Sequence, residues 1–214
     1  MHNPQKIFFL GFHKTGTSSF GVFMKQLGFR SQSYYRPYSR AFALSLKKRD
    51  FRELFETADR FEAFDDDPWY LFYREFEQRY PSAKFVFYER DPGKWYESAL
   101  LYFGRSTTPM AELIFGEGKG SPMFNRDHHL SVYKRHSAEV REYFHDKADK
   151  FLEIPDLSDS SAQAVAKFVG REASGVAFPH ANVNTLSNFE KTKRRYKMHI
   201  ARIMGFGERI VADE

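Results

Sequence analysis

Short, continuous apolar segments alternate along this chain with longer segments in which apolar residues recur at helical spacing. Continuous apolar runs bounded by turn residues suit strands that are buried on both faces of a parallel sheet. We expect such strands at residues 7–10, 61–64, 84–88 and 151–154. Each is followed by a segment typical of an amphipathic helix. This alternation predicts an α/β fold with a central parallel sheet flanked by helices.

The first helix carries Phe20, Phe23, Met24 and Leu27 on one face and ends at Gly28, a natural residue for a helix C-terminus. Further helices are expected at residues 41–48, 51–57, 69–80, 92–102, 126–150, 158–169 and 189–203. Residues 104–125 are rich in Gly, Ser, Thr, Pro and Met, and long loops inside a compact domain are often functional. We therefore expect a lid or acceptor loop with a short helix over residues 103–125.

A phosphate-type loop follows the first strand. The segment from Lys6 to Ser19 reads KIFFLGFHKTGTSS, in which an apolar run stops at Gly11 and a helix follows. A strand, a tight loop and a helix N-terminus form an anion site, because unpaired N–H groups and the positive end of the helix dipole meet there. Gly11 and Gly16 have the spacing of a nucleoside triphosphatase loop, but Thr17 stands where that loop has its lysine. The lysine lies upstream at position 14, which disfavours an ordinary kinase or ATPase.

This loop resembles the 5′-phosphosulfate loop of sulfotransferases that use 3′-phosphoadenosine 5′-phosphosulfate (PAPS), in which a lysine precedes a run of Ser, Thr and Gly. The resemblance implies a P-loop-type three-layer fold, with PAPS as co-substrate and 3′-phosphoadenosine 5′-phosphate (PAP) as product. The implied cofactor-binding residues of the loop are Lys14, Thr15, Gly16, Thr17, Ser18 and Ser19. Lys14 would also be catalytic, because its charge can stabilise the leaving oxygen. The plainer interpretation is a turn before a helix.

A second motif, FVFYERDPGKWYES, spans residues 85–98. Arg90 lies at the end of an expected central strand, where open α/β sheets bind ligands. Ser98 follows on the next helix, on the predicted apolar face that also carries Trp95, Ala99 and Tyr102. Sulfotransferases carry an arginine and a serine at this separation that hold the 3′-phosphate of PAPS, and a guanidinium can donate twice to one phosphate. In the alternative interpretation, Arg90 forms a salt bridge to a neighbouring carboxylate, and the Ser98 hydroxyl donates a hydrogen bond to its own helix.

A third motif, Asp65-Asp66-Asp67-Pro68, again follows a strand and precedes a helix. Sulfotransferases carry a base at the corresponding place, two residues before a proline, so the resemblance assigns catalysis to Asp66. Asp67 is a candidate N-cap. Asp65 and His13 remain alternative bases, and all three acids could instead be solvent-facing.

The resemblance extends over most of residues 6–30, 61–102 and 151–184. The chain lacks the RKG-type segment by which cytosolic members hold the 3′-phosphate. Lys193, Arg194 and Arg195 could replace it, although a basic run on a terminal helix is usually solvated. A cluster of Tyr and Arg at residues 34–40 could line an acceptor site or a solvated surface.

Composition narrows the class of protein further. The 214 residues suggest a single domain over 1–214, and the absence of Cys excludes disulfides and thiolate chemistry. No apolar run approaches the ~20 residues of a membrane span, so we expect a cytoplasmic protein. The histidines lack the spacing of metal ligands, and we expect no metal.

The sequence thus predicts a sulfotransferase that transfers a sulfuryl group from PAPS to a hydroxyl or amine of a small-molecule or carbohydrate acceptor. The acceptor and the oligomeric state stay open. A P-loop kinase of a small metabolite is the enzymatic alternative. A basic nucleic-acid-binding module is another, because the net charge is +5 and the pI about 9.2. It explains neither the loop nor the Arg90/Ser98 pair, so we expect no nucleic-acid partner.

Overall fold

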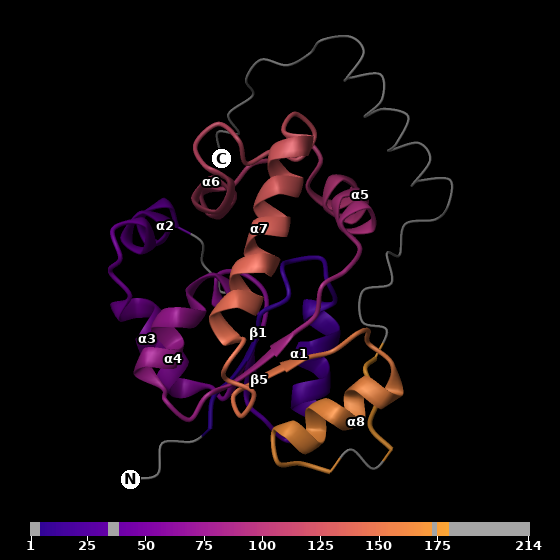
Figure 1. Ribbon diagram of the computed structural model, residues 1–214. Coiled ribbons are helices and arrows are strands. Elements are labelled where there is room, and N and C mark those ends of the chain that lie inside the picture. Colours follow the sequence, from indigo (N-terminus) through magenta and orange to yellow (C-terminus); the bar gives the residue numbers. More distant parts are fainter. Residues whose placement is uncertain (1–4, 34–38, 173–174, 180–214) are drawn as a thin grey trace.

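The computed structural model describes residues 5–33, 39–172 and 175–179. In this part of the chain, strands and helices alternate as the sequence predicts (Figure 1). The elements are β1 (Ile7–Phe9), α1 (Thr17–Gln26), β2 (Ser31–Gln32), α2 (Arg40–Lys47), α3 (Arg52–Arg60), β3 (Ala63–Phe64), the 3₁₀ helix η1 (Trp69–Phe72), α4 (Tyr73–Arg79), β4 (Lys84–Phe87), α5 (Pro92–Phe103), α6 (Pro109–Phe115), α7 (Arg126–Phe144), β5 (Phe151–Glu153) and α8 (Asp159–Phe168).

The strands form one parallel sheet in the order β2-β3-β1-β4-β5. β1 lies in the middle, with Phe8 paired to Phe64 of β3 on one side and to Phe85 of β4 on the other. The chain first adds strands on one side of β1 and then crosses to the other side. Ligands of open α/β sheets bind outside the carboxyl ends of the strands at such a switch point.

Successive residues of β1 point to opposite faces of the sheet and enter different cores. Ile7 and Phe9 pack with the core that α1 and α8 cover. Phe8 packs in the larger core, where its ring stacks on Phe76 of α4 with centroids 4.3 Å apart. Burial on both faces explains why the strands read as continuous apolar runs.

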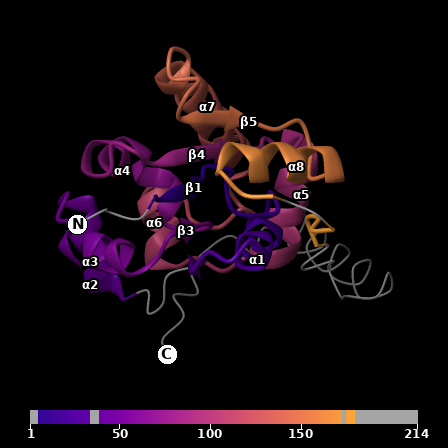
Figure 2. The ribbon, with the colours of Figure 1, turned by 90° about the horizontal axis from the view of Figure 1, so that it is seen from below.

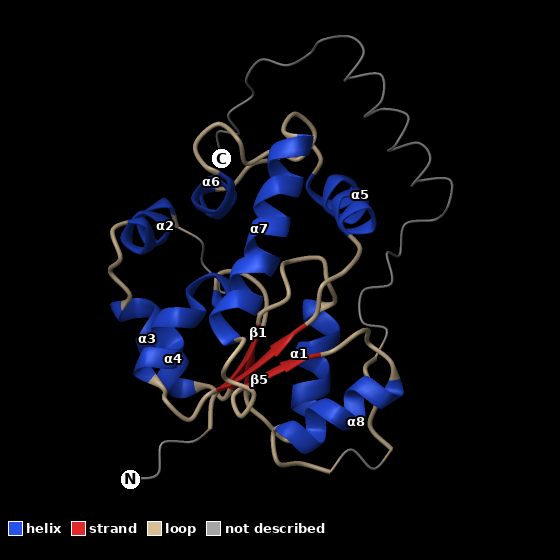
Figure 3. Cartoon of the chain, in the orientation of Figure 1, coloured by secondary structure: helices blue, strands red, loops and turns tan. Residues whose placement is uncertain are grey.

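The helices complete a three-layer α/β/α arrangement. In Figures 1 and 3, α3 and α4 lie on one side of the strands, and α1 and α8 lie on the other. Seen from below, α3 and α4 again lie on the opposite side of the strands from α1 and α8 (Figure 2). The upper half of α7 stands between α5 and α6, beyond the sheet. The predicted fold class is therefore confirmed.

A buried lysine joins the start of β1 to the end of α3. Lys6 is 1% exposed, and its Nζ donates to the carbonyl oxygens of Ala58 and Phe61 at 2.8 and 2.5 Å. A cation at a helix C-terminus satisfies carbonyls that have no partner in the helix. This contact fixes α3 beside β1, just before the chain enters β3.

Several expected boundaries were wrong. The helix expected from Trp69 begins as η1 and becomes α4 only at Tyr73, and α7 ends at Phe144 rather than at residue 150.

Tyr102 was expected on the apolar face of α5, but its side chain is 63% exposed. The tyrosines and arginine of residues 34–38, the helix expected at 189–203, and Lys193, Arg194 and Arg195 lie outside the described residues.

The segment from 104 to 125 contains one helix, as the sequence predicts. Thr108 caps α6, because its hydroxyl accepts the Ala111 N–H at 3.0 Å. His128 and His129, in the first turn of α7, hold this segment through Nε2 bonds to the carbonyl oxygens of Phe115 and Lys119 at 2.6 and 2.8 Å. Across the described residues, no helix combines the length and apolar character that a bilayer crossing needs.

Candidate active site

Three loops meet at the carboxyl edge of the sheet. β1, β3 and β4 are parallel neighbours, so the segments that follow them emerge side by side. These segments are residues 10–16, 65–67 and 88–91. The sheet therefore brings the predicted loop, the predicted base and Arg90 to one edge of the molecule.

The loop after β1 is a tight turn with an unusual backbone. Lys14 and Gly16 have φ angles of 66° and 102°, in the region that favours glycine. The N–H and the hydroxyl of Thr15 both donate to Phe12 O, at 3.1 and 2.6 Å. The Thr15 N–H is thus used inside the turn, and the assignment of Thr15 to the cofactor stays a prediction.

The helix N-terminus lies directly after this turn. α1 begins at Thr17, and Phe20 N–H donates to Gly16 O at 3.0 Å. The N–H groups ahead of Phe20 have no acceptor within the helix. No acidic residue occupies the first turn of α1. The turn therefore brings the N–H groups of the first helical turn together with the positive end of the dipole, which favours an anion.

Lys14 supplies a cation beside this helix end. Its Nζ lies 3.8 Å from the centroid of the Tyr102 ring on α5. Burial lowers the pKa of Lys14, while Asp66 acts to raise it and Arg90 to lower it. Lys14 forms no ion pair with any residue that the structure describes. Its charge is available to a ligand.

Arg90 supports the loop from the end of β4. Its Nη1 donates to Lys14 O at 3.1 Å, and its own carbonyl accepts from the Tyr133 hydroxyl at 2.7 Å. Ser98 lies half-buried on α5. The structure thus brings Arg90 to the loop. The assignment of Arg90 and Ser98 to a 3′-phosphate stays a prediction.

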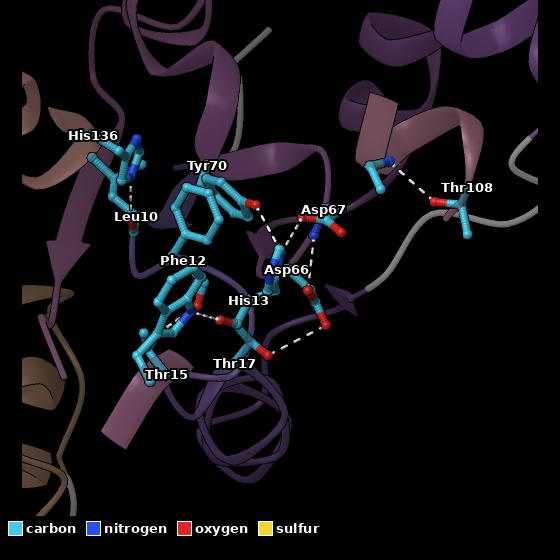
Figure 4. A network of polar contacts seen from close by, with 12 residues as sticks. Leu10, Phe12, His13, Thr15, Thr17, Asp66, Asp67, Tyr70, Thr108 and His136 are labelled. Carbon is cyan, nitrogen blue, oxygen red and sulfur yellow. Dashed lines mark hydrogen bonds and ion pairs between the residues drawn. The ribbon is translucent and has the colours of Figure 1, made fainter. Parts of the chain in front are cut away.

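Asp66 faces the first turn of α1 from the end of β3 (Figure 4). Its Oδ2 accepts from Thr17 Oγ1 at 3.3 Å, and its Oδ1 accepts from the N–H of Asp67 at 3.0 Å. Like Lys14, Asp66 has a positive φ, here 71°, and such strained residues cluster at functional sites. Burial, followed by repulsion from Asp67, raises the pKa of Asp66 to about 6, while His13 acts to lower it.

Asp67 has a different role from the one expected. No side chain caps η1, whose N-cap residue is Pro68, so the prediction of Asp67 as N-cap was wrong. Instead, His13 Nδ1 lies 3.3 Å from Asp67 Oδ1 and 3.1 Å from the Tyr70 hydroxyl (Figure 4). A carboxylate can only accept a hydrogen bond, so this contact places the imidazole proton on Nδ1. His13 is 5% exposed, which limits access to it.

Asp65 points away from the site. Its side chain is 0% exposed, and Oδ1 accepts from the Ser33 hydroxyl at 2.6 Å. Oδ2 is buried without a hydrogen-bond partner. It lies against Gly21 of α1, where a Cβ would approach it to 2.4 Å. Burial raises the pKa of Asp65 well above its ordinary value. Of the three acids, only Asp66 combines partial exposure with a contact to the loop helix.

Comparison with known proteins agrees with this arrangement. A family model described as a sulfotransferase domain matches residues 6–186. The chain belongs to the sulfotransferase family. Its fold is similar to the crystal structure of a sulfotransferase from Alicyclobacillus acidocaldarius, with a TM-score of 0.52 and 16% identity over 97% of both chains. Among curated protein sequences, none matches this one.

Membership of the sulfotransferase family identifies the protein as a transferase.

The site also contains contacts that the sequence analysis did not predict. The Trp95 indole N–H donates to His13 O at 2.8 Å, which ties α5 to the loop. Tyr70 joins the His13–Asp67 pair, and Tyr102 meets Lys14. These partners lie far from the loop in sequence, and helical spacing gave no signal for them. Among the described residues, no group of three or more His, Asp or Glu is placed to hold a metal ion.

Proposed function

We propose that this sulfotransferase transfers the sulfuryl group of PAPS to a hydroxyl or amine of a small-molecule or carbohydrate acceptor. The observation that carries the proposal is the meeting of three groups at one sheet edge. These are the helix N-terminus of α1 with Lys14, the guanidinium of Arg90, and the carboxyl group of Asp66. They provide an anion site, a second cation, and a proton acceptor.

The residues present suit the 5′-phosphosulfate of PAPS. The first turn of α1 contains hydroxyl and apolar side chains but no acid, so it does not repel an anion. Thr17 and Lys14 stand on either side of Gly16, whose left-handed backbone turns the chain into the helix. In this proposal, the residues that hold the 5′ end of the nucleotide are Lys14, Thr15, Gly16, Thr17, Ser18 and Ser19.

The chemistry needs one group that stabilises charge and one that removes a proton. Lys14 would stabilise the negative charge that grows on the bridging oxygen as the sulfur–oxygen bond breaks. Asp66 would accept the proton of the acceptor hydroxyl while the oxygen of that hydroxyl forms its bond to sulfur. A pKa near 6 leaves Asp66 ionised at neutral pH and a stronger base than an ordinary aspartate.

Calorimetry and turnover test the proposal together. The protein would be titrated with PAP, ATP and NAD in EDTA, and ATP would be repeated with Mg²⁺. Turnover would then be measured with PAPS and a panel containing a phenol, a sugar, a simple alcohol and an amine. We expect PAP to bind in EDTA and PAPS to be consumed with at least one acceptor. Binding of Mg²⁺–ATP but not of PAP would instead support the small-metabolite kinase.

A further inference from the structure

Tyr102 is a solvent-exposed aromatic residue whose ring faces the lysine of the loop. The Nζ atom of Lys14 lies 3.8 Å from the ring centroid, although the tyrosine side chain is 63% exposed. An ammonium over an aromatic face is attracted by the ring quadrupole. Burial of the tyrosine does not explain its position, because it lies outside both cores.

α5 and Arg90, which lies just before this helix, contact the loop at two consecutive residues, His13 and Lys14. Trp95 Nε1 donates to His13 O at 2.8 Å, and the Phe103 ring meets the His13 ring edge-on with centroids 5.1 Å apart. For Lys14, Arg90 fixes the carbonyl oxygen from just before α5, and Tyr102 contacts the ammonium. Arg90 thus fixes the backbone of Lys14, and Tyr102 constrains its side chain.

Asp66 competes with Tyr102 for the lysine. The two charges are close enough for Asp66 to raise the pKa of Lys14. An ion pair between them would lower the pKa of Asp66 and satisfy the lysine, so both would be weakened for catalysis. No such ion pair forms between Lys14 and Asp66, and the ammonium lies on the Tyr102 ring.

We propose that Tyr102 is a positioning residue that holds the Lys14 ammonium on its ring and apart from Asp66. This inference rests on the proposed function for the roles of Lys14 and Asp66. In this inference, Tyr102 keeps the Lys14 side chain a cation that is free to bind the nucleotide, and it keeps the Asp66 side chain free to accept a proton.

The test compares Tyr102→Leu, which removes the ring, with Tyr102→Phe, which keeps it. Phe168→Leu is the matched control, since it removes a ring at 4.8 Å from Lys84, which begins β4 at the opposite edge of the sheet. A cation–π contact of this kind corresponds to a change of about threefold to thirtyfold. We expect kcat of Tyr102→Leu to fall by about that factor, while PAP affinity stays within about twofold and Tyr102→Phe behaves as wild type.

The pH profile separates positioning from a loss of structure. The charged and titratable groups that act on the pKa of Asp66 or on which it acts are His13 and Lys14 from the loop and Asp65 and Asp67 from its own segment. If Tyr102→Leu frees Lys14 to approach Asp66, the acid limb of the rate profile moves to lower pH. An unchanged kcat and acid limb in Tyr102→Leu would overturn the inference. So would a Tyr102→Phe variant that is as impaired as Tyr102→Leu, because the ring face would then not be what matters.

A spectroscopic measurement tests the contact without turnover. In protein labelled with ¹³C-lysine, the ε-methylene protons of Lys14 should be shifted upfield by the Tyr102 ring. The signal is assigned by its loss in Lys14→Arg. It should persist in Tyr102→Phe and Phe168→Leu and disappear in Tyr102→Leu. An unshifted signal in wild type would overturn the inference. A shifted signal in a protein that does not bind PAP or consume PAPS would instead overturn the proposed function.

Discussion

Thr17 Oγ1 donates a hydrogen bond to Asp66 Oδ2 over 3.3 Å, which joins the first turn of α1 to the end of β3. The donor belongs to the helix end that favours an anion, and the acceptor is the proposed base. An anion that draws the Thr17 hydroxyl away removes a bond that favours the ionised form of Asp66, and its charge also raises the pKa of this carboxyl group. Nucleotide binding and the basicity of Asp66 are therefore expected to be coupled.

Asp66→Asn should retain the fold and PAP affinity but lower turnover by ~10²-fold or more, the usual scale for a lost general base. Turnover in wild type should rise with pH through an apparent pKa above the value of about 6 in the free protein, because only the ionised carboxyl accepts a proton and bound nucleotide raises its pKa. The measurement is kcat against pH for both proteins, with PAP titrations beside it. The acid limb should be absent from the residual activity of Asp66→Asn.

The two alternative bases provide the controls. Asp65→Asn and His13→Ala should each retain much more activity than Asp66→Asn, because both side chains are buried. If His13→Ala shows the larger loss while Asp66→Asn stays active, the base is the His13 that Asp67 orients. The assignment to the sulfotransferase family would be unaffected.

Asp65→Asn should make unfolding less sensitive to pH. The pKa of Asp65 is raised in the fold, so native Asp65 keeps its proton at pH values where the unfolded chain, with a pKa of about 3.9, has lost it. The native state then binds more protons, and stability falls as pH rises above about 4. Urea unfolding at pH 5 and pH 8 should show that the stability of Asp65→Asn falls less than that of wild type. An equal fall would mean that Asp65 is ionised in the fold.

The sequence predicts the position of the site better than its internal contacts. Strands buried on both faces give continuous apolar runs, so β1, β3 and β4 and the loops after them could be located. Parallel pairing then brings those loops together. Asp67 could not be assigned, because a carboxylate before a helix can cap it or pair with a base, and only the fold shows that His13 lies within reach.

Tyr102 shows a different limit of helical periodicity. It shares the spacing of Trp95 and Ala99 on α5, and these two are buried as predicted. In the last turn of the helix, Leu100 and Phe103 pack against the larger core, whereas Tyr102 contacts Lys14 and is exposed. A periodic pattern predicts which residues share a face, but not which of them the core covers.

Lys14→Ala should lose turnover far more than nucleotide affinity, because the charge of the lysine matters most when the bridging oxygen becomes negative. The control is Lys25→Ala, which removes an exposed lysine from the last turn of α1, the helix that follows the loop, and should leave both quantities unchanged. Single-turnover rates and PAP titrations measure the two quantities separately. Wild-type turnover in Lys14→Ala would reject the assignment of the loop to phosphosulfate.

Arg90→Ala should erase most of the preference for PAPS over adenosine 5′-phosphosulfate, which lacks the 3′-phosphate. A charge-assisted contact contributes roughly 1.5–3 kcal/mol, so the preference should fall on the order of tenfold to a hundredfold.

Arg90 also donates to Lys14 O, and this bond gives the experiment its internal control. Losing it would loosen the loop and weaken both nucleotides alike, which lowers each affinity but leaves their ratio unchanged. Arg90→Lys keeps a charge without the planar fork, so it should restore part of the preference. Titration of the variants with PAP and with adenosine 5′-phosphate, the corresponding pair of products, measures the ratio directly. A constant ratio across wild type, Arg90→Ala and Arg90→Lys would mean that Arg90 supports the loop and does not bind the 3′-phosphate.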